Sequence, residues 1–300
     1  MATTLAQLAP AFAGLFIGYL LRRRGVFSEA DGAFLFRLSF YTCTPALAFS
    51  SLATVSITPQ LLVFPLMAGV VASLAFGGGW LVGRRLRLTG TTRPTFVLAC
   101  MIINSAFVLI FAQALYGDEG VARIAAFDAV NQCITFGWAY AVAAKHNPDH
   151  QGTTFPIRKI LLAPPLCGIA AGVAVNLTNV TVPSAVTNTV TMFGAATIFL
   201  LTVATGILFA PTRTRLLLTA QAIGVRLVCG LVVGAAIIFG FGLDGMDATL
   251  VLMLSLTPVA FNCVTFASVE KLDAEFAAGA LSVSLISSLV LVTAVALLLA

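Results

Sequence analysis

Two apolar stretches, residues 95–115 and 254–271, contain hydrogen-bonding side chains near their middles, and the second also contains a proline. Proline removes one backbone donor and its ring clashes with the carbonyl four residues earlier, so the second helix must kink or break. In hydrocarbon such broken helices occur only inside protein or beside a water-filled cavity. We therefore predict a substrate-binding site at these interruptions, formed by Asn104, Ser105, Thr257, Pro258 and Asn262. The alternative is a kink absorbed by packing, with the asparagines hydrogen-bonding between helices.

Charged side chains inside the apolar stretches are few, and each costs at least about 2.5–3.5 kcal/mol at the bilayer centre. Asp128 begins a polar stripe that continues with Asn131 and Gln132 on the same helix face, which predicts a proton or cation coupling site. Arg226 lies near the middle of its stretch, and its planar guanidinium suits a substrate carboxylate. A structural ion pair between Asp128 and Arg226 stays open as an alternative. Arg37 lies nearer the end of its stretch, so we expect it to reach the surface.

The composition excludes a soluble domain. The chain is 60% hydrophobic and 9% charged, with a mean hydropathy of +1.05, whereas soluble domains carry about 25% charged residues. The pI of about 9.1 does not indicate a nucleic-acid partner, because the basic residues collect in short loops. The six cysteines lie in apolar stretches without a CxxC pair, which predicts neither disulfides nor a metal site. No catalytic set is found within the apolar stretches, so we expect neither an enzyme nor a cofactor.

Apolar runs of membrane-spanning length recur along the chain. We predict ten transmembrane helices, at residues 5–21, 33–52, 61–82, 95–115, 121–143, 160–177, 186–209, 216–239, 248–267 and 277–299. The breaks after odd-numbered runs hold thirteen Lys and Arg residues, and the opposite side holds only Arg123. We expect a multi-pass protein of the plasma (inner) membrane, and by the positive-inside rule both termini should lie outside.

The two halves of the chain align at a constant offset. Leu8-Ala9-Pro10 corresponds to Leu162-Ala163-Pro164, and Gly14 and Gly18 correspond to Gly168 and Gly172. Each half has five predicted helices, an odd number, so the halves must have opposite orientations in the membrane. The predicted fold is an all-α membrane protein of two inverted five-helix repeats, residues 1–144 and 160–300, joined by a cytoplasmic loop at 145–159. Its fourth and ninth helices are broken and cross.

Several motifs in order resemble the auxin efflux carrier family over nearly the whole chain. They are GYLLRRRGVFSEAD (residues 18–31), FYTCTPALAF (40–49), NSAF with YGDEG (104–120), FDAVNQ (127–132) and TPVAFNCVTFA (257–267). The resemblance implies a scaffold of helices 1, 2, 6 and 7, which also offers a homodimer surface, and a transport domain of helices 3–5 and 8–10. It implies transport of a small organic anion such as malonate, malate or an auxin-like acid. Where the family usually has Gly and Pro after the fourth-helix Asn, this chain has Leu109 and Phe111, which predicts a shallower break.

The expected function is therefore a secondary active transporter that moves a small carboxylate across the lipid bilayer by alternating access, with proton or sodium coupling left open. The alternative is a sodium-coupled symporter of the bile-acid type, for which Asp128 and its amide neighbours are the candidate ligands. A channel is less favoured, because no ring of charges lines a predicted pore.

Overall fold

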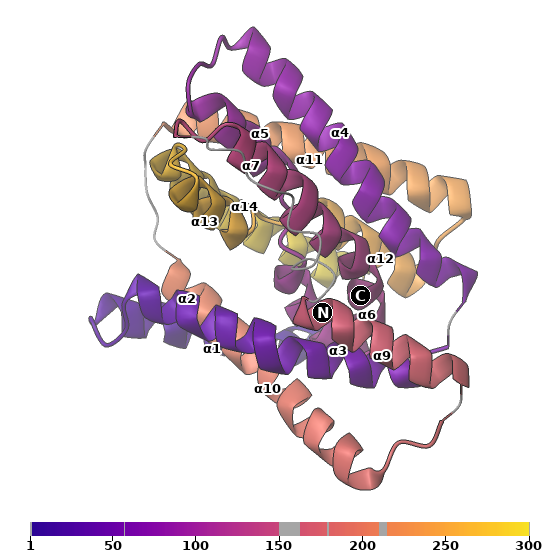
Figure 1. The fold of residues 1–300 in the computed structure, drawn as a ribbon. Helices are drawn as coiled ribbons and strands as arrows, with labels where there is room; N and C mark the ends of the chain where they lie inside the picture. The colour runs from indigo at the N-terminus through magenta and orange to yellow at the C-terminus, as the bar shows by residue number, and fades with distance from the viewer. Residues whose placement is uncertain (1, 57, 150–162, 179, 210–214, 300) are drawn as a thin grey trace.

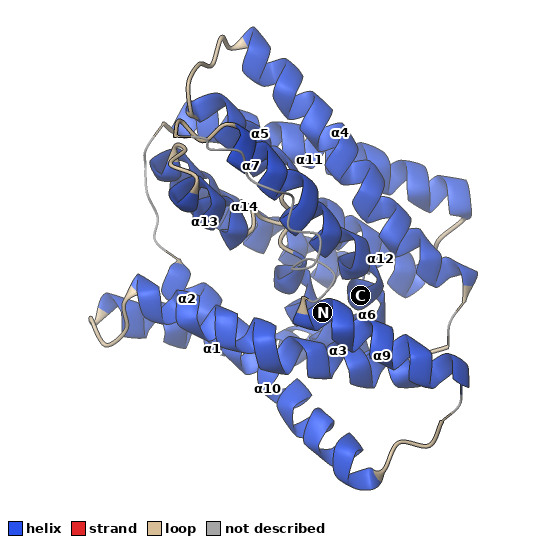
Figure 2. Cartoon of the chain, viewed as in Figure 1, coloured by secondary structure: helices blue, strands red, loops and turns tan. Residues whose placement is uncertain are grey.

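A computed structural model describes the chain except residues 1, 57, 150–162, 179, 210–214 and 300. The described residues form helices and loops (Figure 2), with one isolated β-bridge. The first half contains α1 (Ala2–Arg23), α2 (Glu29–Leu38), η1 (Ser39–Cys43), α3 (Thr44–Thr54), η2 (Pro59–Leu62), α4 (Val63–Arg85), α5 (Thr92–Met101), α6 (Ser105–Cys133), η3 (Ile134–Ala139) and α7 (Tyr140–Lys145). The second half contains α9 (Pro164–Thr178), α10 (Ser184–Leu208), α11 (Leu216–Phe241), α12 (Gly245–Ser255), α13 (Phe261–Val269) and α14 (Ala274–Leu299).

The predicted all-helical fold is confirmed. Among the described residues, four helical segments are long and apolar enough to cross a membrane by themselves: Pro59–Arg85, Ser184–Leu208, Leu216–Phe241 and Ala274–Leu299. The predicted run 5–21 lies within α1, and the remaining runs coincide with shorter helices or with successive helical segments. The α6 helix turns sharply at Gly117, where φ is +58°. The full set of ten spans and its inverted symmetry stay predictions. Most of the predicted 145–159 loop lies outside the described residues.

The helices pack in two groups (Figure 1). The first group consists of α1, α2, α3, α9 and α10, in which α1 lies along α10 and α3 along α9. The second group consists of α4 to α7 and α11 to α14. Glycines bring the first group close together: a Cβ at Gly18 would overlap the carbonyl oxygen of Val203, and a Cβ at Gly168 that of Pro45. The α6 helix makes most of the contacts between the groups.

The two interrupted helices meet inside the second group. α5 ends at Met101 and α6 begins at Ser105, while α12 ends at Ser255 and α13 begins at Phe261. Between these ends, Ile103 and Val259 form an antiparallel bridge. The Asn104 N–H donates to the Pro258 carbonyl at 3.2 Å, and the Ala260 N–H donates to the Ile102 carbonyl at 3.3 Å. The interruptions therefore cross, and each satisfies backbone groups that the other leaves free.

The break in the first of these helices is complete despite Leu109 and Phe111. Both side chains are buried within α6, several residues after the break. Asn104 supplies the helix start, because its side-chain oxygen accepts a hydrogen bond from the Phe107 N–H at 3.3 Å. A shallower break is therefore not observed: residues 102–104 are non-helical and form one side of the bridge.

Arg226, on α11, forms hydrogen bonds to both segments of the crossover. Its guanidinium donates to the carbonyls of Thr257 at 2.8 Å, Ile102 at 3.0 Å and Cys100 at 3.3 Å, and to the Thr257 hydroxyl at 2.8 Å. The side chain is only 3% exposed. These carbonyls belong to the C-terminal ends of α5 and α12, where the helix dipoles are negative, so the buried cation stabilises both helix ends.

We predict that cysteines at Ile103 and Val259 form a disulfide in a background without the six native cysteines. The hydrogen bonds flank this pair, which makes it a non-hydrogen-bonded antiparallel pair with Cα atoms about 4.5 Å apart, within disulfide reach. A gel-shift assay after mild oxidation measures the crosslink. The control pair, Ile103→Cys with Ala248→Cys, places the second thiol at the far end of α12 and should stay reduced. Equal crosslinking of both pairs would contradict the crossover.

We predict that Arg226→Gln lowers the free energy of unfolding by about 3 kcal/mol or more, because hydrogen bonds from charged donors contribute about 1.5–3 kcal/mol each. Adding Asp128→Asn should restore nothing, because the structure does not pair the two side chains. Arg226→Lys, with fewer donors, should fall between. Thermal unfolding in detergent measures all three variants. A stable Arg226→Gln protein that has lost carboxylate binding would instead place Arg226 in the substrate site.

Candidate functional site

A cavity of about 560 Å³ lies beside the crossover. Its lining comes from both helix groups: α2, η1, α3 and α10 of the first, and α6, η3 and α13 with the crossover segments of the second. The crossover contributes Ile103, Asn104, Ser105, Ala260, Phe261 and Asn262. The cavity therefore lies where the two groups meet, at the start of two helices.

These two helix starts give the cavity a positive electrostatic character. α6 begins at Ser105 and α13 at Phe261, and the first residues of both helices line the cavity. No side chain caps the N-terminus of α13. Free N–H groups at a helix N-terminus and the positive end of the helix dipole favour a bound anion. The Asn104 and Asn262 side chains add amide groups beside them.

Asp128 is the acidic side chain of this cavity and is only 8% exposed. Its Oδ1 accepts hydrogen bonds from the Ser105 hydroxyl at 2.5 Å and from the Asn131 amide at 3.0 Å. The side-chain oxygen of Gln132, one turn after Asp128, is buried without a hydrogen-bond partner among the described residues. A carboxylate surrounded by polar groups in this way can take up a proton or help to bind a cation.

Arg37 is the basic residue of the cavity lining, a position that the sequence did not indicate. Arg37 is exposed, and it lies on the face of α2 that also presents Ala33 to the cavity, so its expected reach to the membrane surface stays a prediction. All eleven acidic residues belong to the described part of the chain, and none forms an ion pair with Arg37. The sequence did contain a signal for this position. Ala30, Ala33 and Arg37 are spaced by three and four residues, which places them on one face of the helix.

The structure brings six of the nine predicted site residues to one cavity: Asn104, Ser105, Asp128, Asn131, Gln132 and Asn262. The other three, Thr257, Pro258 and Arg226, are buried behind the crossover and do not line the cavity. The possible ion pair between Asp128 and Arg226 is not formed, since each has other partners. Substrate binding by Arg226 stays a prediction, and in this structure its guanidinium is occupied by protein carbonyls.

Comparison with known proteins agrees with a transport role. Residues 3–296 match the family described as membrane transport protein. The chain is also 24% identical over 280 residues to an uncharacterized transporter of Methanothermobacter thermautotrophicus, which covers 91% of each protein. The family match extends over both interrupted helices and the cavity between the groups. The chain therefore belongs to the membrane transport protein family, the family of the auxin efflux carriers.

Proposed function

We propose that the protein is a secondary active transporter for a small organic carboxylate. The observation that carries this proposal is the cavity at the crossover, which two helix N-termini and the unpaired Arg37 border. A carboxylate there would gain from both helix dipoles and from a guanidinium that can donate two parallel hydrogen bonds. The cavity volume of about 560 Å³ is within the range of small-molecule sites and suits malonate, malate or an auxin-like acid.

The placement of the cavity supports alternating access between the two helix groups. We propose that the first group is the scaffold and that the second group is the moving transport domain. The cavity lies between them, and the α2 residues that line it extend from Arg37 back to Ala30, towards the Arg22–Arg24 loop. Since the positive-inside rule places that loop in the cytoplasm, this conformation would face inward.

The close helix pairs of the first group support the inverted repeat. Gly18 lies in the α1–α10 contact and Gly168 in the α9–α3 contact. The two glycine-bearing helices, α1 and α9, occupy equivalent positions in the two sequence halves. The two broken helices likewise occupy equivalent positions and cross. An inverted repeat of ten helices explains both pairings by a single symmetry.

Cation coupling is the second candidate property, and the sodium-coupled symporter is its strongest form. The specific observation is that the Gln132 side-chain oxygen has no hydrogen-bond partner in the described residues and lies one turn from the Asp128 carboxylate. Oxygen ligands of this kind suit a hard cation, whereas protonation requires only the carboxylate. We propose Asp128 as the coupling residue in either case.

We predict that Arg37→Gln weakens carboxylate binding by about ten- to a hundredfold, because charged hydrogen bonds contribute about 1.5–3 kcal/mol. The thermal stability without ligand should stay unchanged, since Arg37 has no ion-pair partner to lose. Ligand-induced shifts in melting temperature, titrated with malonate, malate and aromatic acids, measure the binding. Arg24→Gln, on the same membrane side but outside the cavity, is the matched control. Unchanged binding in Arg37→Gln would exclude Arg37 from the site, and a wild-type protein that binds none of these acids would refute the substrate class.

We predict that Asp128→Asn removes the dependence of uptake on the coupling ion, because an amide neither takes up a proton nor neutralises a cation. Exchange of substrate between the two sides should persist. Uptake into proteoliposomes under separate proton and sodium gradients, with exchange measured in parallel, distinguishes the two couplings. Glu275→Gln, which alters an exposed carboxylate, is the control. Uptake by the variant that still follows the gradient would place coupling elsewhere.

A further inference from the structure

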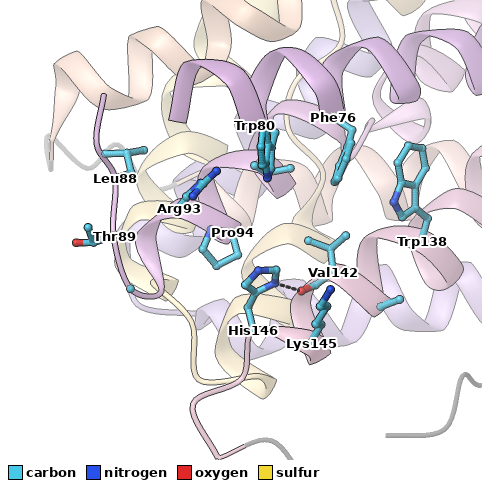
Figure 3. Close-up of a pocket in the computed structure, with 13 residues that line it drawn as sticks. Phe76, Trp80, Leu88, Thr89, Arg93, Pro94, Trp138, Val142, Lys145 and His146 are labelled. Atoms are coloured by element: carbon cyan, nitrogen blue, oxygen red, sulfur yellow. Dashed lines mark hydrogen bonds between the residues drawn. The ribbon is translucent and has the colours of Figure 1, made fainter. Parts of the chain in front are cut away.

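A second cavity, of about 720 Å³, lies outside the crossover site and has a different lining. It is bounded by α4, by α5 with the loop before it, and by η3 and α7 (Figure 3). Phe76 and Trp80 extend from α4 on one side, and Lys145 and His146 lie on the other, with Arg93 between them. None of the residues assigned to the crossover site lines this cavity.

Its basic side chains are not neutralised by carboxylates. Arg93, Lys145 and His146 line the cavity, and none of the chain's eleven acidic residues, all of them described, pairs with them. Nearby acidic residues are engaged elsewhere, since Lys271 pairs with Asp149 and Arg215 pairs with Asp273 at 2.7 Å. The cavity lining contains no Asp or Glu. The cavity therefore favours an anion.

The Trp80 ring positions the Arg93 guanidinium at the boundary between the cavity and the surrounding lipid. The Arg93 guanidinium lies over the Trp80 ring, 4.9 Å from its centroid, a cation–π arrangement that orients the arginine. Trp80 is 46% exposed and is followed by Leu81 at 50%, so the rim of the cavity continues into an apolar outer surface of α4. Tryptophan is enriched at membrane interfaces, where its ring contacts both headgroups and acyl chains.

The helix ends place the cavity at the level of lipid headgroups. α4 ends at Arg85, α5 begins at Thr92 and α7 ends at Lys145, and all three ends lie on the Lys/Arg-rich side of the membrane. We propose that this cavity binds the phosphate headgroup of an anionic phospholipid of that leaflet. Its acyl chains would lie along the exposed face of α4. Basic cavities between transmembrane helices recognise anionic headgroups in this way.

The chain offers a direct reporter of this site, because its two tryptophans, Trp80 and Trp138, both line the cavity. The protein is reconstituted in phosphatidylcholine bilayers that contain equal fractions of dibrominated phosphatidylglycerol or dibrominated phosphatidylcholine. Bromine quenches tryptophan fluorescence on contact, so quenching measures occupancy by each lipid. We expect the anionic lipid to associate at least fivefold more strongly than phosphatidylcholine, from roughly 1 kcal/mol per basic side chain.

Paired variants test the assignment to these side chains. The double variant Arg93→Gln with Lys145→Gln should lose the preference for the anionic lipid. Arg85→Gln, at the end of α4 but outside the cavity lining, should keep the preference. The charge-retaining pair Arg93→Lys with Lys145→Arg should also keep it. An unchanged melting temperature and tryptophan emission maximum show that the variants are folded. Loss of the preference in the folded charge-retaining pair would contradict recognition of the headgroup by these charges.

Three outcomes would overturn the proposal. Equal quenching of the wild type by both lipids would show that the cavity does not select a headgroup. A preference that survives in the folded neutral pair would assign selection to another surface. Loss of the preference when millimolar glycerol phosphate or inorganic phosphate is added would assign the cavity to a soluble phosphate compound instead of a lipid. The readout does not depend on transport, so it is separate from the proposed carrier function.

Discussion

The structure depends on the hydrogen bonds that pair the free backbone groups at the crossover of the two broken helices. Each break frees carbonyl and N–H groups in a part of the protein that excludes water, where an unpaired group is costly. The antiparallel bridge at Ile103 and Val259 satisfies part of this need. The Arg226 guanidinium donates hydrogen bonds to three carbonyl oxygens that the breaks leave free. A cation that is expensive to bury is stabilised there by two negative helix ends.

This arrangement divides the crossover into two electrostatic faces. The C-terminal ends of α5 and α12 are turned towards Arg226, and the N-terminal ends of α6 and α13 border the cavity. The cavity is thus bordered by the positive ends of two helix dipoles and by the guanidinium-bearing Arg37. The Asp128 carboxylate accepts a hydrogen bond from the Ser105 hydroxyl at the start of α6, so it places a negative charge beside the positive end of that helix. A site with this balance can bind an anion and sense a proton or a metal cation at the same time.

The sequence contained enough information to locate the crossover but not to assign every role in it. Polar residues and a proline inside apolar runs revealed both breaks, because such residues need a reason in hydrocarbon. The partners of Arg226 were not predictable, since backbone carbonyls occur at every residue and carry no sequence signal. Arg37 was missed for a related reason: its position near a helix end is equally compatible with the membrane surface and with the face of α2 that borders the cavity. The turn at Gly117 agrees with the predicted break between two spans, because φ of +58° there favours glycine.

The distribution of ion pairs is compatible with the proposed movement of the second helix group as one body. Arg123 joins α6 to Asp247 of α12, and Arg215 joins the start of α11 to Asp273 before α14. The Arg123–Asp247 pair links the two sequence halves, and both pairs lie within the second group. The ion pairs of the described residues all fall inside one group or the other, so none has to break when the groups slide. Their interface is formed largely by apolar side chains along α6, whose contacts are non-directional and can be exchanged at low cost. The cavity proposed for the substrate lies in this interface, and therefore in the place where such a displacement would change access from one side of the membrane to the other.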